Sequence, residues 1–469
     1  MTNRTWRLLG TAAAFLALTT AAVGCGSDGG SSSSSTTKPS GTDAGKTINV
    51  PADYPTIQKA VDAAKKGDLV LVAEGTYNEA VDVTTPNITI RGLDRNKTIL
   101  DGQFKLENGI RILDTDGVVV ENMTARNYVS NGFFWTGSDY YRGSYLTAYR
   151  NGDYGVYSFQ AHHGQFDHSY GSGSPDAGFY IGGCYKCDAV IDTVVSEYNG
   201  LGYSGTNSGG DLYIINSEFA HNRAGMVPNS GSYEPCYPGR ANTIVGNTVH
   251  DNNYLDGPGI DASLLAQGNG ILLAGSINND VERNLVYNHD RTGIAAVPFP
   301  EDDASDTPPP ASELDKTCDP QDTSGVPAKS PGFVLWPATG NKIIGNVISG
   351  SGLADIAEGT IPADAATIKA LNNCFSDNEV KSTSPTNLQE LAPCEGEGSG
   401  GDFAAGALDI TVLVAEQPAK PDNTKLYRTQ PTPPAQENMP DAAKAPAPLF
   451  KGPATPDVAS IKVPQKPSN

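Results

Sequence analysis

A glycine followed by an apolar residue recurs through the middle of the chain at a nearly constant interval. The successive intervals are 23, 23, 23, 24, 23, 45 and 23 residues. The glycines concerned are Gly109, Gly132, Gly155, Gly178, Gly202, Gly225, Gly270 and Gly293. A fixed period in the low twenties is typical of a solenoid, in which each repeat can bury its apolar face only against its neighbours.

Apolar and other side chains alternate after these glycines, as in Phe133 and Trp135 or Ile271 and Leu273. This period of two indicates strands with one buried face and excludes helical repeats. A second short strand precedes most of the glycines, for example at residues 118–120. Short strands in a coil of about 23 residues predict an all-β fold, a single-stranded parallel β-helix spanning residues 47–395.

The start of the predicted solenoid carries one amphipathic helix. Ile57, Ala60, Val61 and Ala64 share one apolar face, and Pro55 stands where a helix can begin. Because the open end of a solenoid exposes unpaired strand edges, we expect this N-terminal helix to cap it.

Four runs of sequence around this helix resemble a known family. Residues 56–64, 67–72, 75–79 and 87–90 are similar to the N-terminal segment of pectin methylesterases and other right-handed β-helix proteins. The resemblance implies a right-handed coil. It does not imply esterase activity, because the Asp-Phe-Ile-Phe-Gly motif of that family is absent from this sequence.

Residues 1–24 have the features of a signal peptide. Arg4 and Arg7 precede an apolar run, and residues 22–25 resemble a bacterial lipobox, with Ala22 where that motif prefers Leu. The resemblance implies that Cys25 is lipidated. The Ser/Gly-rich composition of residues 25–46 predicts a flexible tether. We therefore expect an exported protein, lipid-anchored on the outer face of the cytoplasmic membrane or at the cell surface. An ordinary secretory signal is the alternative.

Three insertions interrupt the coil, at residues 230–240, 254–267 and 300–331. Loops inserted in successive coils often lie on one face, which is often the binding face. The third insertion is acidic between Glu301 and Asp322, and its carboxylates could hold Ca²⁺ or form a solvated charge run. After residue 395 the chain becomes rich in Pro and Ala, and we expect a mostly disordered tail over residues 396–469.

Charge and cysteine content limit the partners and the compartment. The net charge of -21 makes nucleic acid binding improbable, because such a surface repels phosphate groups. With Cys25 lipidated, six cysteines remain, an even number that favours disulfides in an exported protein. We expect Cys374 to pair with Cys394 and Cys187 with Cys236, in a monomeric protein.

Candidate catalytic residues follow from the period, because residues one coil apart become neighbours along the axis. Two columns and a nearby arginine are predicted: Asp139, His162 and Tyr185; Tyr140, His163 and Lys186; and Arg142. A uronate lyase or epimerase needs a His or Tyr base and a cation that neutralises the substrate carboxylate, and Tyr140 would contact the sugar. A column of solvated polar turn residues is the alternative.

Phe134, Tyr157 and Tyr180 each follow their glycine by two places. If they point outward, they could form a platform for sugar rings, or they could simply stack across the strands.

Three functions remain open. The first is a surface lipoprotein that binds or modifies polysaccharide, as a lyase or epimerase of acidic glycan if it is an enzyme. The second is a non-catalytic envelope scaffold that contacts other envelope components. The third is a metal-handling or assembly factor.

Overall fold

We describe a computed structural model in which residues 45–301, 318, 334–361, 363–419, 425–446 and 448–466 are placed. The predicted signal peptide, Cys25 and almost all of the tether lie outside the described residues, as does most of the third insertion.

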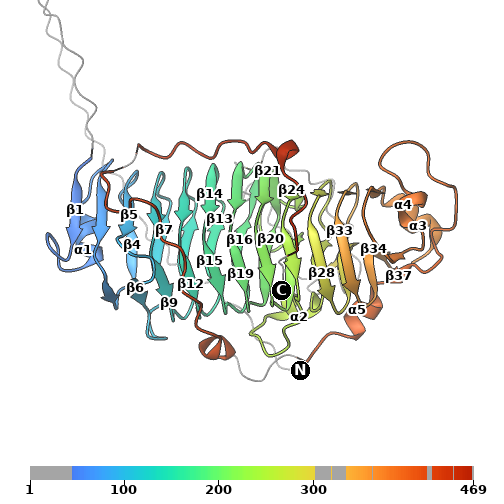
Figure 1. The fold of residues 1–469 in the computed structure, drawn as a ribbon, viewed down its shortest axis with the longest axis horizontal. Helices are drawn as coiled ribbons and strands as arrows, with labels where there is room; N and C mark the ends of the chain where they lie inside the picture. Colours follow the sequence, from blue (N-terminus) through green and yellow to red (C-terminus); the bar gives the residue numbers. More distant parts are fainter. Residues whose placement is uncertain are drawn as a thin grey trace, which may run out of the picture. The chain divides into compact units, whose positions relative to one another are not determined.

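The strands form three long parallel sheets that run along one solenoid (Figure 1). Sheet A contains, in spatial order, β1 (Thr47–Val50), β2 (Leu69–Val72), β5 (Thr89–Gly92), β8 (Val119–Glu121), β11 (Arg142–Ser144), β14 (Gly164–Asp167), β18 (Ala189–Asp192), β21 (Ser208–Ile215), β24 (Arg240–Val245), β27 (Asp280–Glu282), β32 (Lys342–Ile344) and β35 (Cys374–Ser376), with β17 (Cys184–Tyr185) beside β21. Sheet B contains β3 (Gly75–Tyr77), β6 (Thr98–Asp101), β9 (Thr124–Arg126), β12 (Thr147–Tyr149), β15 (Tyr170–Ser172), β19 (Val195–Glu197), β22 (Glu218–Ala220), β25 (Thr248–His250), β28 (Leu285–His289) and β33 (Val347–Ser351).

Sheet C carries the strands that follow the repeated glycines. Its members are β4 (Val81–Val83), β7 (Ile110–Leu113), β10 (Phe133–Thr136), β13 (Val156–Phe159), β16 (Ala177–Gly182), β20 (Leu201–Thr206), β23 (Ala224–Asn229), β26 (Ile271–Ala274), β29 (Thr292–Val297), β34 (Ala354–Thr360) and β36 (Thr383–Ser384), with β37 (Leu408–Asp409) beside β34. Most coils contribute one strand to each sheet, so the chain advances by one strand position per turn. This confirms the predicted parallel β-helix.

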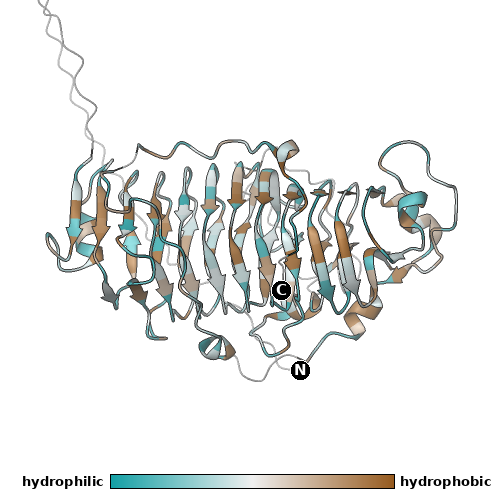
Figure 2. Ribbon diagram, in the orientation of Figure 1, coloured by the Kyte–Doolittle hydropathy of each residue, from teal (hydrophilic) through white to brown (hydrophobic). Residues whose placement is uncertain are grey.

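The glycine period corresponds to the register of sheet C. Phe133 lies opposite Val156, and Val156 lies opposite Phe179 on the next coil. Phe133, Phe179 and Trp135 are fully buried inside the solenoid, as the alternation predicts. Hydrophobic segments recur along the strands in Figure 2, which is consistent with a core enclosed by the three sheets.

Buried asparagines form ladders between coils. Asn279 donates a side-chain hydrogen bond of 2.7 Å to Asn341 and accepts one of 2.8 Å from Asn242. Ladders of this kind run through three sets: Asn199, Asn222 and Asn252; Asn242, Asn279, Asn341 and Asn373; and Asn247, Asn284, Asn346 and Asn378. Because a buried amide without a partner is costly, these ladders fix the vertical alignment of the turns.

The two ends of the solenoid are capped differently. Helix α1 (Ile57–Ala63) is N-capped by Thr56 and buries Ile57, Ala60 and Val61, as predicted. At the other end lie α3 (Ala365–Ala370) and α4 (Leu388–Leu391). The insertion at 254–267 carries α2 (Asp261–Leu265), while β30 (Phe299–Glu301) pairs antiparallel with β31 (Val334–Trp336).

The C-terminal tail contains α5 (Thr411–Ala415) and two short 3₁₀ turns, η2 (Leu426–Thr429) and η3 (Val458–Ser460). The sequence predicts disorder here, whereas the described parts of the tail lie against the solenoid (Figure 1). Asn96 and Gln436 exchange two hydrogen bonds of 2.8 Å, and Arg283 Nε donates to the Ile461 carbonyl oxygen over 2.9 Å. Side chains of the solenoid thus supply hydrogen-bond partners for backbone groups of the tail. An extended Pro-rich segment cannot supply such partners within itself.

The disulfides differ in part from expectation. Cys374 is bonded to Cys394, as expected. Cys187 is bonded to Cys184, and Cys236 to Cys318, so the expected Cys187–Cys236 pair is wrong. The reason is local, because the turn between Cys184 and Cys187 brings their Cα atoms within 5.0 Å of each other.

None of the helices in the described ranges has the length and apolar character needed to cross a lipid bilayer.

Candidate functional site

The structure brings together part of the two predicted columns. We call Asp139, Tyr140, His162 and His163 the turn cluster. His162 Nδ1 lies 3.1 Å from Asp139 Oδ1, and His163 Nδ1 lies 2.6 Å from Asp188 Oδ2. The Tyr140 ring stacks on His163 with centroids 4.6 Å apart. The hydrogen bond from His162 lowers the pKa of Asp139. Each of these histidines is therefore already engaged with a carboxylate.

Tyr185 and Lys186 do not continue these columns. Five positions separate Phe159 from Gly164, but seven separate their strand partners, Gly182 and Ala189. The longer turn shifts the register, so the backbone of His163 bonds to Cys187 rather than to Lys186.

The side chains of the displaced pair lie elsewhere. Lys186 Nζ is 3.3 Å from Asp211, and the Tyr185 ring lies 3.7 Å below the Arg240 guanidinium. The tail also reaches this region, since a Cβ atom placed on Gly452 would lie 3.5 Å from the Cβ of His163. The predicted columns therefore do not form one continuous row of side chains. Part of them is also covered by the tail.

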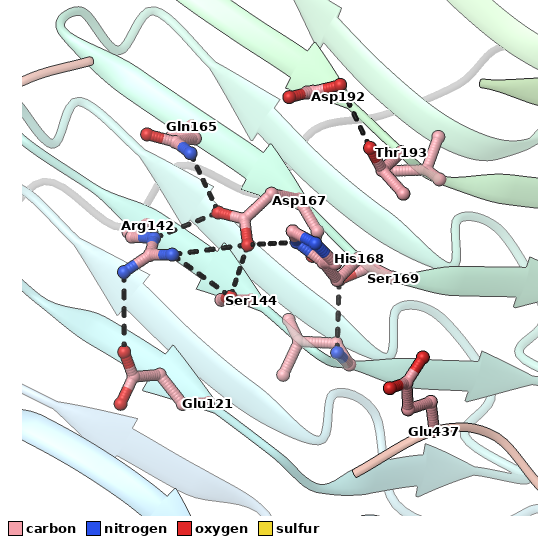
Figure 3. Close-up of polar contacts among 12 residues, drawn as sticks. Glu121, Arg142, Ser144, Gln165, Asp167, His168, Ser169, Asp192, Thr193 and Glu437 are labelled. Atoms are coloured by element: carbon pink, nitrogen blue, oxygen red, sulfur yellow. Dashed lines mark hydrogen bonds and ion pairs between the residues drawn. The ribbon is translucent and has the colours of Figure 1, made fainter. Parts of the chain in front are cut away.

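Arg142 belongs to a separate network on sheet A (Figure 3). Its Nε atom lies 2.9 Å from Asp167 Oδ2, and its Nη1 atom lies 3.6 Å from Glu121 Oε1. Burial opposes ionisation of Asp167, but hydrogen bonds from His168 and Arg142 lower its pKa. Because both carboxylates are almost fully buried, Arg142 balances their charge and is not placed to neutralise a substrate beside His162.

The predicted aromatic platform is a stack along the solenoid axis. Tyr157 lies between Phe134 and Tyr180, with ring centroids 4.9 and 4.8 Å away and interplanar angles of 4° and 13°. Both faces of Tyr157 are therefore covered by neighbouring rings, and Tyr180 is only 1% exposed. The arrangement favours cross-strand stacking over a platform on which a sugar ring could lie flat.

Polar groups gather around this stack on sheet C. Tyr154 donates a hydrogen bond of 2.7 Å to Asp176, and Tyr180 donates one of 2.5 Å to Glu234. The Tyr154 ring lies 4.9 Å from Tyr180, which joins the two pairs. We call this set the tyrosine–carboxyl cluster, comprising Asp153, Tyr154, Tyr157, Asp176, Tyr180, Tyr233 and Glu234.

The cluster reaches the solvent at one side. Tyr233 is 51% exposed and accepts a hydrogen bond of 3.1 Å from Asn229 on β23. Asp153 and Glu234 are half-buried, whereas Asp176 is buried. The exposed part of the cluster is therefore the Tyr233 side chain, whereas Tyr180 and Asp176 are buried.

The carboxyl groups of the cluster hold protons more tightly than usual. Burial, followed by repulsion from Asp153, raises the pKa of Asp176, and burial also raises the pKa of Asp153. Burial raises the pKa of Glu234 to about 8, and repulsion from Asp176 adds to this shift. Strongly shifted pKa values of this kind cluster at functional sites.

Sequence reasoning missed these three acids, although a signal for two of them was present. Asp153 and Asp176 each stand two residues before a repeated glycine, Gly155 and Gly178. Glu234 lies in the first insertion and has no counterpart in the repeat, so no period could connect it with Tyr180.

Metal binding receives no support within the described residues, where no group of three or more His, Cys, Asp or Glu side chains could hold an ion. Glu301, the first acid of the proposed Ca²⁺ loop, accepts hydrogen bonds from Ser232 and from Trp336 Nε1, the latter over 2.7 Å. The rest of that loop lies outside the described residues, apart from Cys318.

A comparison with protein-family models gives the same fold. Residues 131–298 match the family model described as "Right handed beta helix region". The structure is similar to an A-module of mannuronan C-5 epimerase from Azotobacter vinelandii, at 14% identity and a TM-score of 0.46, covering 73% of this chain and 93% of that one. It is also similar to an alginate lyase from a Paenibacillus species, at 16% identity and a TM-score of 0.39, covering 53% and 89%. No match was found among curated protein sequences.

Proposed function

We propose that this right-handed β-helix protein binds a glycan at the tyrosine–carboxyl cluster. One observation carries the proposal: the Tyr154–Asp176 and Tyr180–Glu234 pairs lie side by side, next to the half-exposed Tyr233. A glycan presents many hydroxyl groups that both donate and accept hydrogen bonds, and phenol and carboxyl groups can satisfy both roles. Aromatic rings with a few convergent polar groups are typical of small-molecule sites.

Lyase or epimerase chemistry on an acidic glycan at the turn residues is the second candidate. The contact between His162 and Asp139 favours it, because a carboxylate can orient a histidine base. Against it, Lys186 pairs with Asp211, and Arg142 pairs with Asp167 and Glu121. The cations that such chemistry needs for a uronate carboxylate are thus engaged within the protein.

We further propose that the protein acts outside the cytoplasm, anchored through Cys25. The lipobox-like sequence supports this proposal. The three disulfides are consistent with it, because disulfides persist mainly in oxidising compartments.

Glycan binding by the full chain tests the proposal. A panel of cellohexaose, maltohexaose, chitosan hexamer and oligogalacturonate should contain at least one binder. Tyr233→Ala should abolish that binding, because it removes an exposed ring of the cluster. Tyr140→Ala removes an exposed ring of the turn cluster and serves as the matched comparison. Loss of binding in Tyr140→Ala alone, or no binder in the panel, would overturn the proposal.

A further inference from the structure

We propose that an apolar cavity beneath α5, on the outward face of sheet C, binds the single acyl chain of a fatty acid or a single-chain lipid. The cavity lies between sheet C, the end of α2, β30 and α5. This site is separate from the tyrosine–carboxyl cluster, whose residues do not line it. The inference therefore does not depend on glycan binding.

The floor of the cavity is a part of sheet C whose outward positions are apolar. In the register of the sheet, Tyr180 lies opposite Ser204, and Ser204 lies opposite Val227 on the next coil. Further along, Leu272 lies opposite Ala295. Val227, Leu272 and Ala295 are buried in a hydrophobic cluster separate from the solenoid core. Because the outward face of a sheet is polar where it meets water, this part of sheet C requires an apolar cover.

Two irregular segments form the walls of the cavity. Leu265 and Ala266, at the end of α2, line one side, and Phe299 on β30 also lines the cavity. The buried Arg223 side chain holds the α2 segment by donating a hydrogen bond of 2.7 Å to the Gly257 carbonyl oxygen. Strand β30 is held by its pairing with β31. Both walls are therefore supported by contacts outside the cavity.

Helix α5 of the tail forms the roof. Ile410, Leu413 and Val414 line the cavity, and their spacing of three and four residues places them on one face of the helix. The start of the helix is anchored, because β37 pairs with β34 and Asp409 accepts a hydrogen bond of 2.9 Å from the Thr411 amide. Ile410 and Leu413 are buried, whereas Val414 is 42% exposed. The roof is thus tighter at the start of α5 than at its end.

A second cavity adjoins the first at the same helix. The two cavities share four lining residues: Leu265, Pro300, Ile410 and Val414. The second cavity is also lined by Ile361, Thr411 and Gln417. The first has a volume of about 510 Å³ and the second about 680 Å³, and the second is the more open and the more polar. The surroundings therefore become more apolar from the surface inward.

This gradient of polarity selects a ligand with an apolar chain and a polar end. Asn229 is the one polar side chain that lines the inner cavity, and it is already bonded to Thr206 and Tyr233. A polar ligand group there would lose its hydrogen bonds to water without replacement, which is costly. Thr411 and Gln417 can instead bond to a polar head group at the outer cavity. An acyl chain that enters from the outer cavity satisfies both conditions.

The alternative is that α5 simply packs on the sheet as a cover, and the helix offers a matched control for it. Val412 and Val414 are exposed to a similar degree, 37% and 42%. Val414 lines both cavities, whereas Val412 lines neither. A carboxylate introduced at either position disturbs the helix itself to a similar extent. A carboxylate at position 414 alone is placed beside the ligand.

The test is the binding of cis-parinaric acid, a fatty acid whose fluorescence rises in apolar surroundings, to the full chain. Saturable binding of one probe molecule per chain is expected. Displacement by palmitate identifies a free fatty acid as the ligand, and displacement only by a lysophosphatidylcholine with the same chain identifies a lipid. An unbound probe, or a probe that neither compound displaces, would overturn the proposal.

Two valine variants then locate the bound probe. Val414→Asp should weaken binding by at least about 10-fold, because the acyl chain would lie against a charged group. Val412→Asp should bind the probe as the wild type does. Equal affinities in these two variants would show that the probe binds elsewhere and would overturn the proposal.

A third variant fills the inner cavity from its floor. Ala274 lies on β26 and lines the cavity, so the ring of Ala274→Phe would occupy space that the acyl chain requires. Probe binding should fall by at least about 10-fold in this variant while its Tm stays within a few degrees of the wild type. Unchanged binding in a folded Ala274→Phe chain would contradict the site. If this variant does not fold, the comparison of Val414→Asp with Val412→Asp decides.

Discussion

The Tyr180 hydroxyl group lies 2.5 Å from Oε2 of Glu234 and joins β16 to a loop that begins 50 residues later in the chain. Tyr180 points outward from sheet C because its neighbours Phe179 and Ile181 fill the solenoid core. The inserted loop closes over that outward face and contributes a carboxyl group to it. The tyrosine–carboxyl cluster thus arises where a regular repeat meets an irregular insertion.

Stability should decrease as the pH rises through neutrality, because Glu234 ionises less readily in the folded chain. Its pKa rises from 4.5 to about 8 on folding, so the folded state binds more protons than the unfolded state between these values. The contribution of Glu234 is therefore fully present below pH 4.5 and is lost as the pH approaches 8. Thermal unfolding across this range should show a falling Tm whose slope is smaller in Glu234→Gln, because Asp176 and Glu358 also have pKa values raised to about 8. An unchanged slope in the variant would contradict the assignment.

Removing one amide from an asparagine ladder should destabilise the solenoid. Asn279 is fully buried and is bonded to both Asn242 and Asn341. Asn279→Ala removes the acceptor of the backbone and side-chain amides of Asn242 and should lower the free energy of unfolding by about 1–3 kcal/mol. Asn253→Ala, whose side-chain hydrogen bonds are exposed, should have a much smaller effect in the same urea titration. Equal effects would argue against the ladder.

The tail should be released when Arg95 is truncated. This buried arginine donates hydrogen bonds to Thr147, to carbonyl oxygens of the solenoid and, over 3.2 Å, to the Glu437 carbonyl oxygen of the tail. Arg95→Ala should cost about 3 kcal/mol of stability and expose residues 430–446 to limited proteolysis. Lys97→Ala is the control, since Lys97 makes only exposed ion pairs. A tail equally protected in both variants would show that Arg95 does not hold it.

The lipid anchor is tested by a change at Cys25. Cys25→Ser removes the thiol that the lipobox-like sequence would modify, and the variant should move from the membrane fraction to the aqueous phase on detergent partitioning. Retention of Cys25→Ser in the membrane fraction would contradict lipidation at this residue.

The β-helix could be predicted from sequence because its signals are local and periodic. Gly132 and Gly155 mark successive coils, and the alternation that follows them predicts the buried face of sheet C. The predicted columns assumed that the same period holds across every turn, but one turn breaks it. Between Gly182 and Ala189 the chain has two more residues than on the preceding coil, which moves Lys186 away from His163.

The cluster could be predicted only in part for a related reason. The spacing of Asp153 and Asp176 follows the repeat, so the sequence contained their alignment. The approach of Glu234 depends on how the inserted loop folds back, through Asn207 and the Cys236–Cys318 bond. Contacts of that kind depend on tertiary packing and leave no period in the sequence.

Hydrogen–deuterium exchange of the full chain can locate the glycan site on the solenoid. The probe is the oligosaccharide of the panel that binds most tightly. We expect slower exchange on binding at residues 153–157, 176–182 and 229–235, and no change at residues 139–142 or 162–163. Protection confined to the turn residues, or none in the cluster, would contradict the proposed location.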